Sequence, residues 1–213
     1  MEFLDEQLDD YVCNHTSKES EQLYKLNRET WMNVLQPRML SGHLQGRALS
    51  MLSKMIQPKN ILEIGTYTGY SALCLAEGLA ENGKLHTIDI NEELEPIYSK
   101  YFKDSDYADR IVPHIGNALE IVPKLDQDFD LVFIDADKGN YINYYNLMIE
   151  RMKVGTYIVA DNVLWSGKVL DDYNKLDPDT KTLVDYNKMI QEDERVENIL
   201  FPIRDGLMIA RIL

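Results

Sequence analysis

The sequence predicts an α/β protein with a doubly wound, mostly parallel sheet that is covered by helices on both faces. From Lys59 onward, short apolar runs alternate with segments that carry apolar residues at helical spacing. The apolar runs are continuous rather than alternating, which indicates strands buried on both faces, as in a parallel sheet. The chain ends in two apolar runs joined by Arg204-Asp205-Gly206, which predict a terminal antiparallel hairpin.

Length and composition limit the class of protein. With 213 residues, 45% apolar and 27% charged, the chain fits one globular domain, 1–213, with a substantial core. No apolar run approaches the ~18 residues of a membrane span, and the acidic N-terminus lacks the order of a signal peptide, so we expect a cytoplasmic protein without a membrane partner. The net charge of −14 argues against extended contact with nucleic-acid phosphates, although it leaves a short RNA contact open.

Residues 1–57 predict a helical cap on the core at 58–213. Apolar residues recur at helical spacing over 3–14 and 18–35, both in an acidic background. Pro37 ends the second helix, and a third follows a turn at Ser41-Gly42.

Five apolar runs and five helical segments make up the predicted core. The runs expected to form strands are Ile61–Ile64, Leu85–Ile90, Ile111–Ile115, Leu131–Ile134 and Tyr157–Ala160. The segments expected to form helices lie near 70–82, 92–103, 117–125, 140–152 and 178–192. The carboxyl ends of parallel strands share one edge of the sheet, and ligands bind beyond that edge.

The stretch Asn60–Ser71, NILEIGTYTGYS, carries the first sign of a cofactor. It predicts a buried strand, a tight glycine turn and a helix N-terminus, which together let a cofactor approach bare backbone. Its spacing is E-x-G-x-x-x-G (Glu63, Gly65, Gly69) and differs from the G-x-G-x-x-G that holds a pyrophosphate. A cofactor with a sulfonium and an amino acid instead profits from a carboxylate such as Glu63.

Polar residues also follow the second and third strands. Asp89 closes the second strand, twenty residues after Gly69, where an acid accepts hydrogen bonds from ribose hydroxyls in doubly wound folds. Asn117 and Ala118 follow the third strand, where the edge of an adenine can meet backbone or the Asn117 amide. The glycine spacing alone is also typical of an ordinary tight turn, but its combination with Glu63, Asp89 and Asn117 at consecutive strand ends indicates a cofactor site.

The fourth and fifth strands end in acids. Asp135 and Asp137 follow the fourth strand, and Asp161-Asn162 follows the fifth. Like charges gathered at one edge repel one another unless something neutralises them, and the hard oxygen ligands of Asp135, Asp161 and Asn162 suit Mg²⁺, Mn²⁺ or Ca²⁺. Capping of helices by Asp137 and Asn162 is the alternative interpretation. The edge that they share with the cofactor residues favours a cation site.

Four stretches together resemble a known family. LEIGTYTGYS, HTIDIN, FIDADKGNY and VADNVLWSGKV are similar to the class I, cation-dependent O-methyltransferases that include the caffeoyl-coenzyme A and catechol enzymes, over about residues 30–213. The resemblance implies a seven-stranded sheet with an antiparallel last strand, S-adenosylmethionine (SAM) as cofactor, and Asp135, Asp161 and Asn162 as ligands of a divalent cation. By motif position, the residues that it implies for the cofactor are Met39, Ser41, Glu63, Gly65, Thr66, Tyr67, Ser71, Asp89, Asn117, Ala118, Asp135 and Asp137.

The resemblance also implies the catalytic roles. Lys138 is similar to the family's general base, three residues after the catalytic cation ligand Asp135, and a nearby cation disfavours the charged ammonium. Trp165 is similar to a residue that flanks the acceptor ring. A surface lysine that caps Asp137, and a tryptophan that only packs, are the alternatives. The catechol enzymes carry an aromatic residue where this chain has Asp137, and the short 166–178 segment has no counterpart of the plant enzymes' acceptor loops, so the acceptor stays open.

Taken together, we expect a SAM-dependent, cation-dependent O-methyltransferase of a catechol-like, hydroxylated aromatic small molecule. The family commonly forms dimers, so we expect a homodimer. Three other hypotheses stay open: methylation of a hydroxylated tRNA base, a non-catalytic ligand-binding relative, and an NAD(P) oxidoreductase. The acidic composition argues against binding of tRNA. The presence of Asp135, Lys138, Asp161 and Asn162 argues against a non-catalytic relative, and the glycine spacing and terminal hairpin argue against an NAD(P) oxidoreductase. None of the four histidines (His15, His43, His86, His114) is spaced with another ligand, so we assign none of them to the site.

Overall fold

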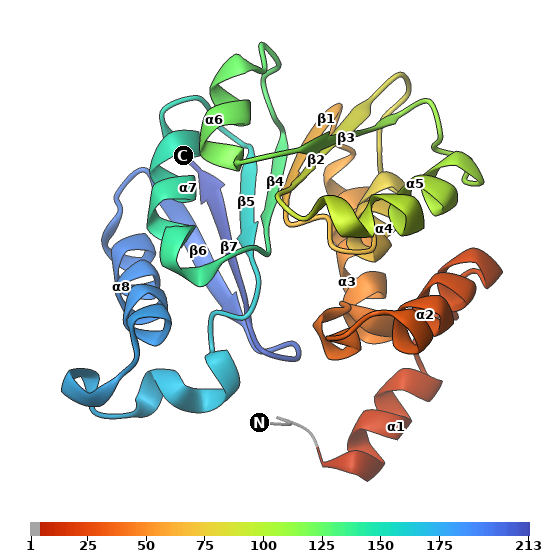
Figure 1. Ribbon diagram of the computed structural model, residues 1–213. Coiled ribbons are helices and arrows are strands. Elements are labelled where there is room, and N and C mark those ends of the chain that lie inside the picture. Colours follow the sequence, from red (N-terminus) through yellow and green to blue (C-terminus); the bar gives the residue numbers. More distant parts are fainter. Residues whose placement is uncertain (1–4) are drawn as a thin grey trace.

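Seven strands form one sheet in the computed structural model, which describes residues 5–213 (Figure 1). They are β1 (Asn60–Ile64), β2 (Lys84–Asp89), β3 (Ile111–Ile115), β4 (Leu131–Ile134), β5 (Tyr157–Ala160), β6 (Val196–Phe201) and β7 (Leu207–Ile212). Their order is β3-β2-β1-β4-β5-β7-β6. The first five pair in parallel, and β7 pairs antiparallel with both β5 and β6. The predicted fold class and the terminal antiparallel hairpin are confirmed.

Helices cover both faces of this sheet (Figure 1). The α-helices are α1 (Glu6–Asn14), α2 (Glu21–Asn33), α3 (Gly42–Ile56), α4 (Tyr70–Ala76), α5 (Glu95–Lys103), α6 (Ala118–Ile121), α7 (Tyr141–Ile149) and α8 (Pro178–Glu192). The 3₁₀ turns are η1 (Pro37–Met39), η2 (Glu92–Leu94), η3 (Val122–Lys124), η4 (Lys138–Asn140), η5 (Trp165–Leu170) and η6 (Tyr173–Lys175). Helices α6, α7 and α8 pack on one face, and α2 to α5 on the other.

The side chains of β1 show how the strands serve both layers. Leu62 and Ile64 belong to the apolar cluster with α6 to α8, whereas Ile61 belongs to the cluster with α2 to α5. Successive side chains of a strand point to opposite faces, so a strand between two helical layers is apolar on both. This is the physical reason for the continuous apolar runs in the sequence.

Several predicted helices are shorter in the structure than in the sequence pattern, and two of them show a physical reason. The helix expected over 70–82 ends at Ala76, and Gly78 just beyond it packs against the backbone of α3 at Ser53 and Lys54, where a Cβ atom would overlap. The helix expected over 117–125 continues as the 3₁₀ turn η3, because Pro123 cannot donate a helical hydrogen bond.

The N-terminal helices differ in how they join the core. Leu23 and Leu26 of α2 and Leu49 of α3 are buried in the apolar cluster on their face of the sheet, whereas α1 buries no side chain. The start of the helix predicted over 3–14, including Leu4, lies outside the described residues. Within residues 5–213, no helix is long and apolar enough to cross a membrane; the cytoplasmic location stays a prediction.

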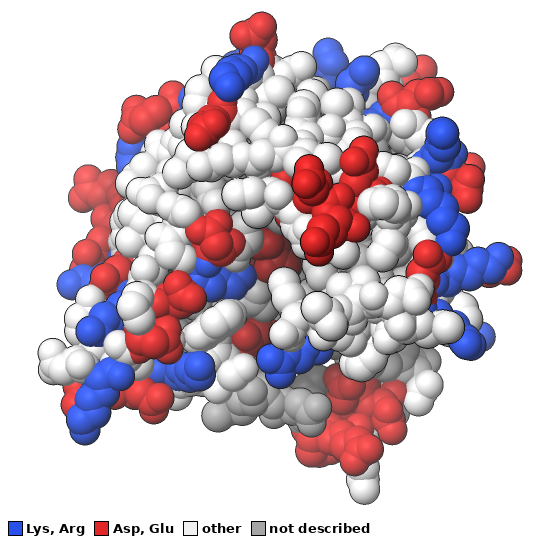
Figure 2. All heavy atoms as spheres, viewed as in Figure 1, with Lys and Arg blue, Asp and Glu red and all other residues white. Residues whose placement is uncertain are grey.

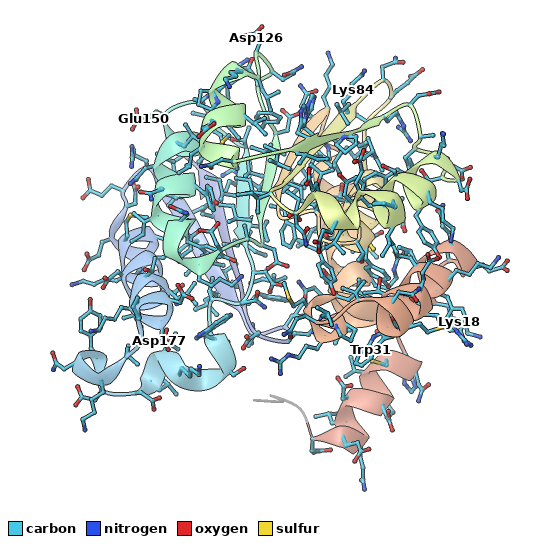
Figure 3. The ribbon with its side chains drawn as sticks, in the orientation of Figure 1. Lys18, Trp31, Lys84, Asp126, Glu150 and Asp177 are labelled. Carbon is cyan, nitrogen blue, oxygen red and sulfur yellow. The ribbon has the colours of Figure 1, made fainter. Side chains whose placement is uncertain are left out.

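The two ends of the sheet have different roles. Figure 3 places Lys84, at the start of β2, and Asp126, before β4, at one end of the molecule, and Asp177, which caps α8, at the other. Because β1 to β5 are parallel, their carboxyl ends lie together. The predicted site residues follow those ends.

Candidate active site

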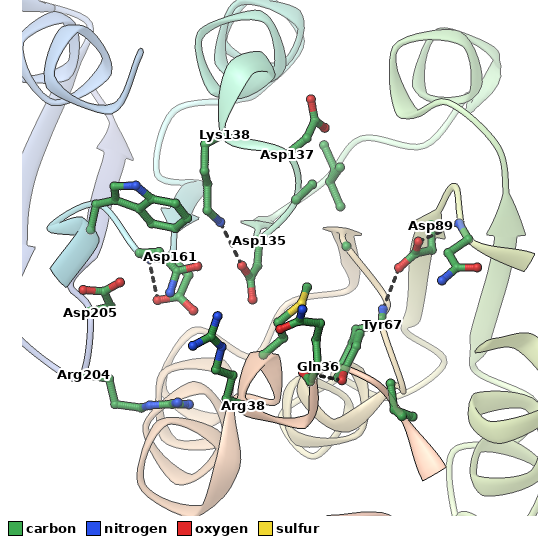
Figure 4. Close-up of a pocket in the computed structure, with 18 of the residues that line it drawn as sticks. Gln36, Arg38, Tyr67, Asp89, Asp135, Asp137, Lys138, Asp161, Arg204 and Asp205 are labelled. Carbon is green, nitrogen blue, oxygen red and sulfur yellow. Dashed lines mark hydrogen bonds and ion pairs between the residues drawn. The ribbon is translucent and has the colours of Figure 1, made fainter. Parts of the chain in front are cut away.

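A cleft of about 1840 Å³ opens beyond the carboxyl ends of the parallel strands (Figure 4). Its wall combines the ends of β1 to β5 with η1 and with the turn between β6 and β7. The predicted site residues that line it are Met39, Gly65, Tyr67, Asp89, Asn117, Ala118, Asp135, Asp137, Lys138, Asp161, Asn162 and Trp165. Those that do not line it are Ser41, Glu63, Thr66 and Ser71.

Gly65 brings the ends of β1 and β4 together. Its φ of +108° is in the region that favours glycine, and a Cβ atom there would overlap the carbonyl of Asp135, 2.7 Å from its carbon. The Asp135 backbone N–H also donates to the Ile64 carbonyl at 2.8 Å. Gly65 is therefore required by the close approach of Asp135, and Gly69 similarly leaves room for the Phe102 ring rather than for open cleft.

Glu63 lies beneath the glycine turn rather than in the cleft. Its side chain is fully buried and accepts a hydrogen bond from the hydroxyl of Thr87, its register partner on β2. Burial, with the charges of Asp135 and Asp89 adding to it, raises the pKa of Glu63 to about 8. Thr66 bonds the same Thr87 hydroxyl at 2.6 Å. These buried groups support the turn from below, and any effect on a ligand passes through the backbone.

Asp89 holds the backbone of the glycine turn. Its Oδ2 accepts the backbone N–H of Tyr67 at 2.7 Å, and its Oδ1 accepts that of Asn91 at 2.9 Å (Figure 4). Tyr67 in turn donates its hydroxyl to the carbonyl of Gln36, between α2 and η1, at 2.9 Å. The Asp89 carboxylate thus holds the backbone of the glycine turn, and Tyr67 links that turn to the segment between α2 and η1.

Lys138 reaches into the cleft from η4, directly after β4. Its Nζ donates to Asp135 Oδ1 at 3.2 Å and to the Tyr141 hydroxyl at 2.6 Å, and the side chain is only 8% exposed (Figure 4). The Tyr141 hydroxyl in turn donates a hydrogen bond to the backbone carbonyl of Asp161 at 3.0 Å. The Nζ also lies 5.7 Å from the centroid of the Trp165 ring. Lys138 is therefore a buried, oriented amine between a carboxylate and an aromatic wall, and not a solvated surface lysine.

Asp161 is a buried carboxylate at the end of β5. It is 3% exposed, and its Oδ1 accepts the backbone N–H of Asn162 at 2.7 Å. Burial, reinforced by the nearby charge of Asp135, raises the pKa of Asp161 above its usual range. Two carboxylates that repel each other across a cleft, with the Asn162 amide beside them, form an oxygen donor set that fits a hard divalent cation. Within residues 5–213, no group of three His, Cys, Asp or Glu side chains is placed to hold a metal, and this set has two acids and an amide.

Asp137 and Asn117 lie on the part of the wall that adjoins β3 and β4. The carboxylate of Asp137 accepts hydrogen bonds from the Tyr144 hydroxyl and the Asn140 amide. Asp137 also lines the cleft. Asn117 caps α6 by accepting the backbone N–H of Leu119 at 3.0 Å. Asn117 therefore caps a helix and lies on the cleft wall, whereas Asp137 lies on the wall and its side chain makes no capping hydrogen bond to the backbone.

Backbone strain gathers at this cleft. Of the seven non-glycine residues with positive φ in residues 5–213, the five on the wall are Tyr67, Asn162, Trp165, Ser166 and Arg204. Such conformations cost about 1–3 kcal/mol each and persist only where the surroundings fix them. The concentration of this strain on one surface supports its assignment as the functional site.

Several wall residues were not predicted from the sequence. Arg38 of η1 points into the cleft toward Asp135 and Asp161 (Figure 4), and Arg204 and Asp205 reach it from the β6–β7 turn. Residues Ile90 and Asn91 extend the wall beside Asp89. Ile90 and Asn91 could have been predicted, because they come directly after the end of a strand. The sequence does not indicate that Arg38 and Arg204 reach the cleft, because the fold brings them there from outside the parallel strands.

Acids predominate around the cleft. Besides the strand-end carboxylates, its wall includes Glu6, Asp9, Asp10, Glu93, Asp179 and Asp205. Figure 2 shows acidic atoms in and around the hollow in the middle of this face. The charge of the surroundings therefore favours cations and disfavours polyanions.

Known O-methyltransferases resemble this chain over most of its length. Residues 13–213 match the O-methyltransferase family. Caffeoyl-CoA O-methyltransferase 1 of Eucalyptus globulus is 38% identical over 179 residues, which span 78% of this chain and 72% of that protein. The caffeoyl-CoA O-methyltransferase of Medicago sativa is 37% identical over 180 residues, with the same coverage of 78% and 72%.

Solved structures share the fold over almost the whole chain. The O-methyltransferase from Bacillus cereus, in complex with SAH, superposes with a TM-score of 0.89 at 28% identity, covering 97% of this chain and 97% of that one. TomG from Streptomyces achromogenes, involved in tomaymycin synthesis and in complex with SAM, gives a TM-score of 0.87 at 29% identity, covering 97% and 96%.

Proposed function

Because the chain belongs to the O-methyltransferase family, and is therefore an enzyme that uses SAM, we propose that it methylates a hydroxyl of a catechol-like small molecule with the help of a divalent cation. One observation carries this proposal. The acids and the lysine at the ends of β4 and β5 share a single cleft with the glycine turn of β1 and the polar residues after β2 and β3.

The half of the cleft at β1 to β3 holds the cofactor in this proposal. When bound, SAM supplies a methyl group on a positively charged sulfur. Gly65 and Tyr67 present backbone, Asp89 keeps that backbone in place, and Asn117 and Ala118 offer the polar edge for an adenine. The acidic surroundings stabilise a cationic ligand.

The half at β4 and β5 holds the acceptor. Asp135, Asp161 and Asn162 would hold the divalent cation, which when bound lowers the pKa of a chelating hydroxyl and fixes its direction. Lys138, whose Nζ faces the cleft 3.2 Å from Asp135 Oδ1, would take the hydroxyl proton in its neutral form, after the cation beside it has favoured loss of the ammonium proton. Trp165 provides a flat wall for an aromatic ring. The main contribution of the chain is to orient two bound molecules for in-line attack.

The arrangement disfavours the alternative acceptor, a hydroxylated tRNA base. A nucleic acid brings phosphates to the protein surface, and the wall of this cleft carries Glu6, Asp9, Asp10 and Glu93. The negative charges of these carboxylates repel the phosphates and weaken binding. A small neutral aromatic acceptor meets no such cost.

A methyl-transfer screen tests the proposed function. Purified protein is incubated with SAM carrying a labelled methyl group and with catechols, caffeoyl esters, flavonoids or tRNA. We expect label in a vicinal dihydroxy aromatic compound and none in its singly hydroxylated analogue. Equal transfer to both analogues, or transfer to tRNA alone, would contradict the proposed acceptor class, and calorimetry with S-adenosylhomocysteine (SAH) checks the cofactor site independently.

We also propose that two copies of the chain associate. Large apolar side chains are exposed on α2 and α3, including Trp31, Met51 and Met55 at 60%, 58% and 73% (Figure 3 labels Trp31). Exposed apolar groups of this size often mark protein interfaces. Light scattering should give twice the mass of one chain, and a monomer at micromolar concentration would rule this out.

A further inference from the structure

A buried glutamine of the helical cap contacts the carboxylate at the end of β5. The Nε2 of Gln45, on α3, donates to Oδ2 of Asp161 at 2.6 Å. Gln45 is 1% exposed and Asp161 is 3% exposed, so water does not compete for this bond. Asp161 Oδ1 is already held by the Asn162 backbone N–H. Each oxygen of Asp161 thus has one protein donor, and the direction of the carboxylate is fixed from both sides.

The orientation of the Gln45 amide follows from its other neighbour. Nη1 of Arg204, in the β6–β7 turn, lies 3.3 Å from Gln45 Oε1. A guanidinium can only donate hydrogen bonds, so the amide oxygen must face Arg204 and the NH₂ must face Asp161. The same Nη1 donates to the backbone carbonyls of Leu40 and Ser41, just before α3. Arg204 therefore sets the amide of Gln45 and the start of its helix together.

We propose that Gln45 is a positioning residue that holds Asp161 in the orientation needed for divalent-cation binding, and that Arg204 fixes Gln45 in that role. This inference rests on the proposed function, in which Asp161 is a cation ligand. A neutral amide suits the task, because it orients the carboxylate without neutralising the charge that attracts the cation. A lysine or arginine at position 45 would form an ion pair with Asp161 and compete with the cation.

The arrangement joins three parts of the chain that are far apart in sequence. Gln45 comes from the helical cap, Asp161 from the end of a parallel strand and Arg204 from the terminal hairpin. Neither Gln45 nor its amide lines the cleft, so its effect on a ligand passes through Asp161. Loss of the amide should weaken cation binding and leave the binding of SAH unchanged.

Direct binding of Mn²⁺ to the protein, measured by calorimetry without acceptor, tests the inference. The variant Gln45→Met keeps the length of the side chain and removes the donor, while Asp161→Asn reports loss of the ligand itself. Ser53→Ala is the matched control on the same helix, because it removes a buried hydrogen bond to Leu75 without contact to Asp161. We expect Gln45→Met to raise the Mn²⁺ dissociation constant by about 10–100-fold, the usual effect of losing the partner of a metal ligand. Its SAH dissociation constant should stay at the wild-type value, and Ser53→Ala should leave both constants unchanged.

The outcomes separate the inference from the proposed function. If the wild type binds Mn²⁺ and Gln45→Met binds it equally well, the inference is wrong and the cation site stands. If the wild type binds SAH but no Mn²⁺, the cation part of the proposed function fails and the inference with it. Should Gln45→Met not fold, Arg204→Met carries the test; it should raise the Mn²⁺ dissociation constant by a smaller factor, and an unchanged constant would overturn the inference.

Discussion

Replacement of Gly65 by alanine tests how the cofactor half of the cleft is built. The φ of +108° at this position is strained for any residue with a Cβ atom, and that atom would overlap the carbonyl of Asp135. The left-handed conformation costs about 1–2 kcal/mol, and pushing β4 away from β1 adds a comparable amount because the overlapping atom is backbone. We therefore expect Gly65→Ala to lower the free energy of unfolding by about 3 kcal/mol, or the melting temperature by about 6–12 °C for a chain of this size.

The same change should also damage function. Moving Asp135 relative to the glycine turn alters both halves of the cleft at once, so SAH affinity should fall together with stability. The control is Gly139→Ala, in η4 after β4, where the nearest atom to a Cβ is Asp179 Oδ1 at 3.7 Å. Urea unfolding and calorimetry with SAH measure the two effects. If Gly65→Ala matched Gly139→Ala in both stability and SAH affinity, the close approach of β1 and β4 would not be what positions the site.

Three further predictions concern single groups. Lys138→Met should lower kcat by about 10²–10⁴-fold without changing SAH affinity, whereas Lys168→Met on the same wall should have little effect; equal losses would remove Lys138 as the base. Trp165→Ala should raise the KM of the acceptor by about three- to tenfold, the value of one aromatic contact, and a change confined to SAH affinity would contradict this role. Burial, with His114 adding to it, lowers the pKa of His86 to about 4, below the value of 6.5 that applies to the unfolded chain. The folded state thus disfavours the charged imidazole, so stability should be complete above pH ~6.5 and fall by about 1–2 kcal/mol toward pH ~4, after allowance for solvent screening; urea unfolding across this range should show the loss, and His86→Leu should flatten it.

The strand ends are the part of the site that the sequence predicted well. Asp89, Asp135 and Asp161 each follow an apolar run, and a parallel sheet must bring the carboxyl ends of such runs together. Contacts that depend on where the cap and the hairpin dock were not predictable in this way. Arg38 and Arg204 reach the cleft from outside the parallel strands, and no local pattern encodes that approach.

Burial explains the other differences between expectation and structure. Glu63 is on the right strand, but its side chain alternates away from the cleft and bonds Thr87 inside the protein. Ser71 belongs to α4, a helix whose residues are all buried, and it does not line the cleft. His86 and His114 are far apart in sequence, yet the β2–β3 register brings Nδ1 of the first within 3.0 Å of Nε2 of the second. Side-chain direction and register are properties of the folded sheet, and single-residue motifs do not contain them.

The central claim is that one cleft joins a methyl donor to an acceptor held by a divalent cation. It is tested most directly by methyl transfer from SAM to a catechol in excess EDTA, followed by the addition of excess Mg²⁺. We predict that EDTA abolishes transfer, that Mg²⁺ restores it, and that SAH binding is the same in both conditions. Undiminished transfer in EDTA would contradict the claim and would leave Asp135, Asp161 and Asn162 without their proposed role.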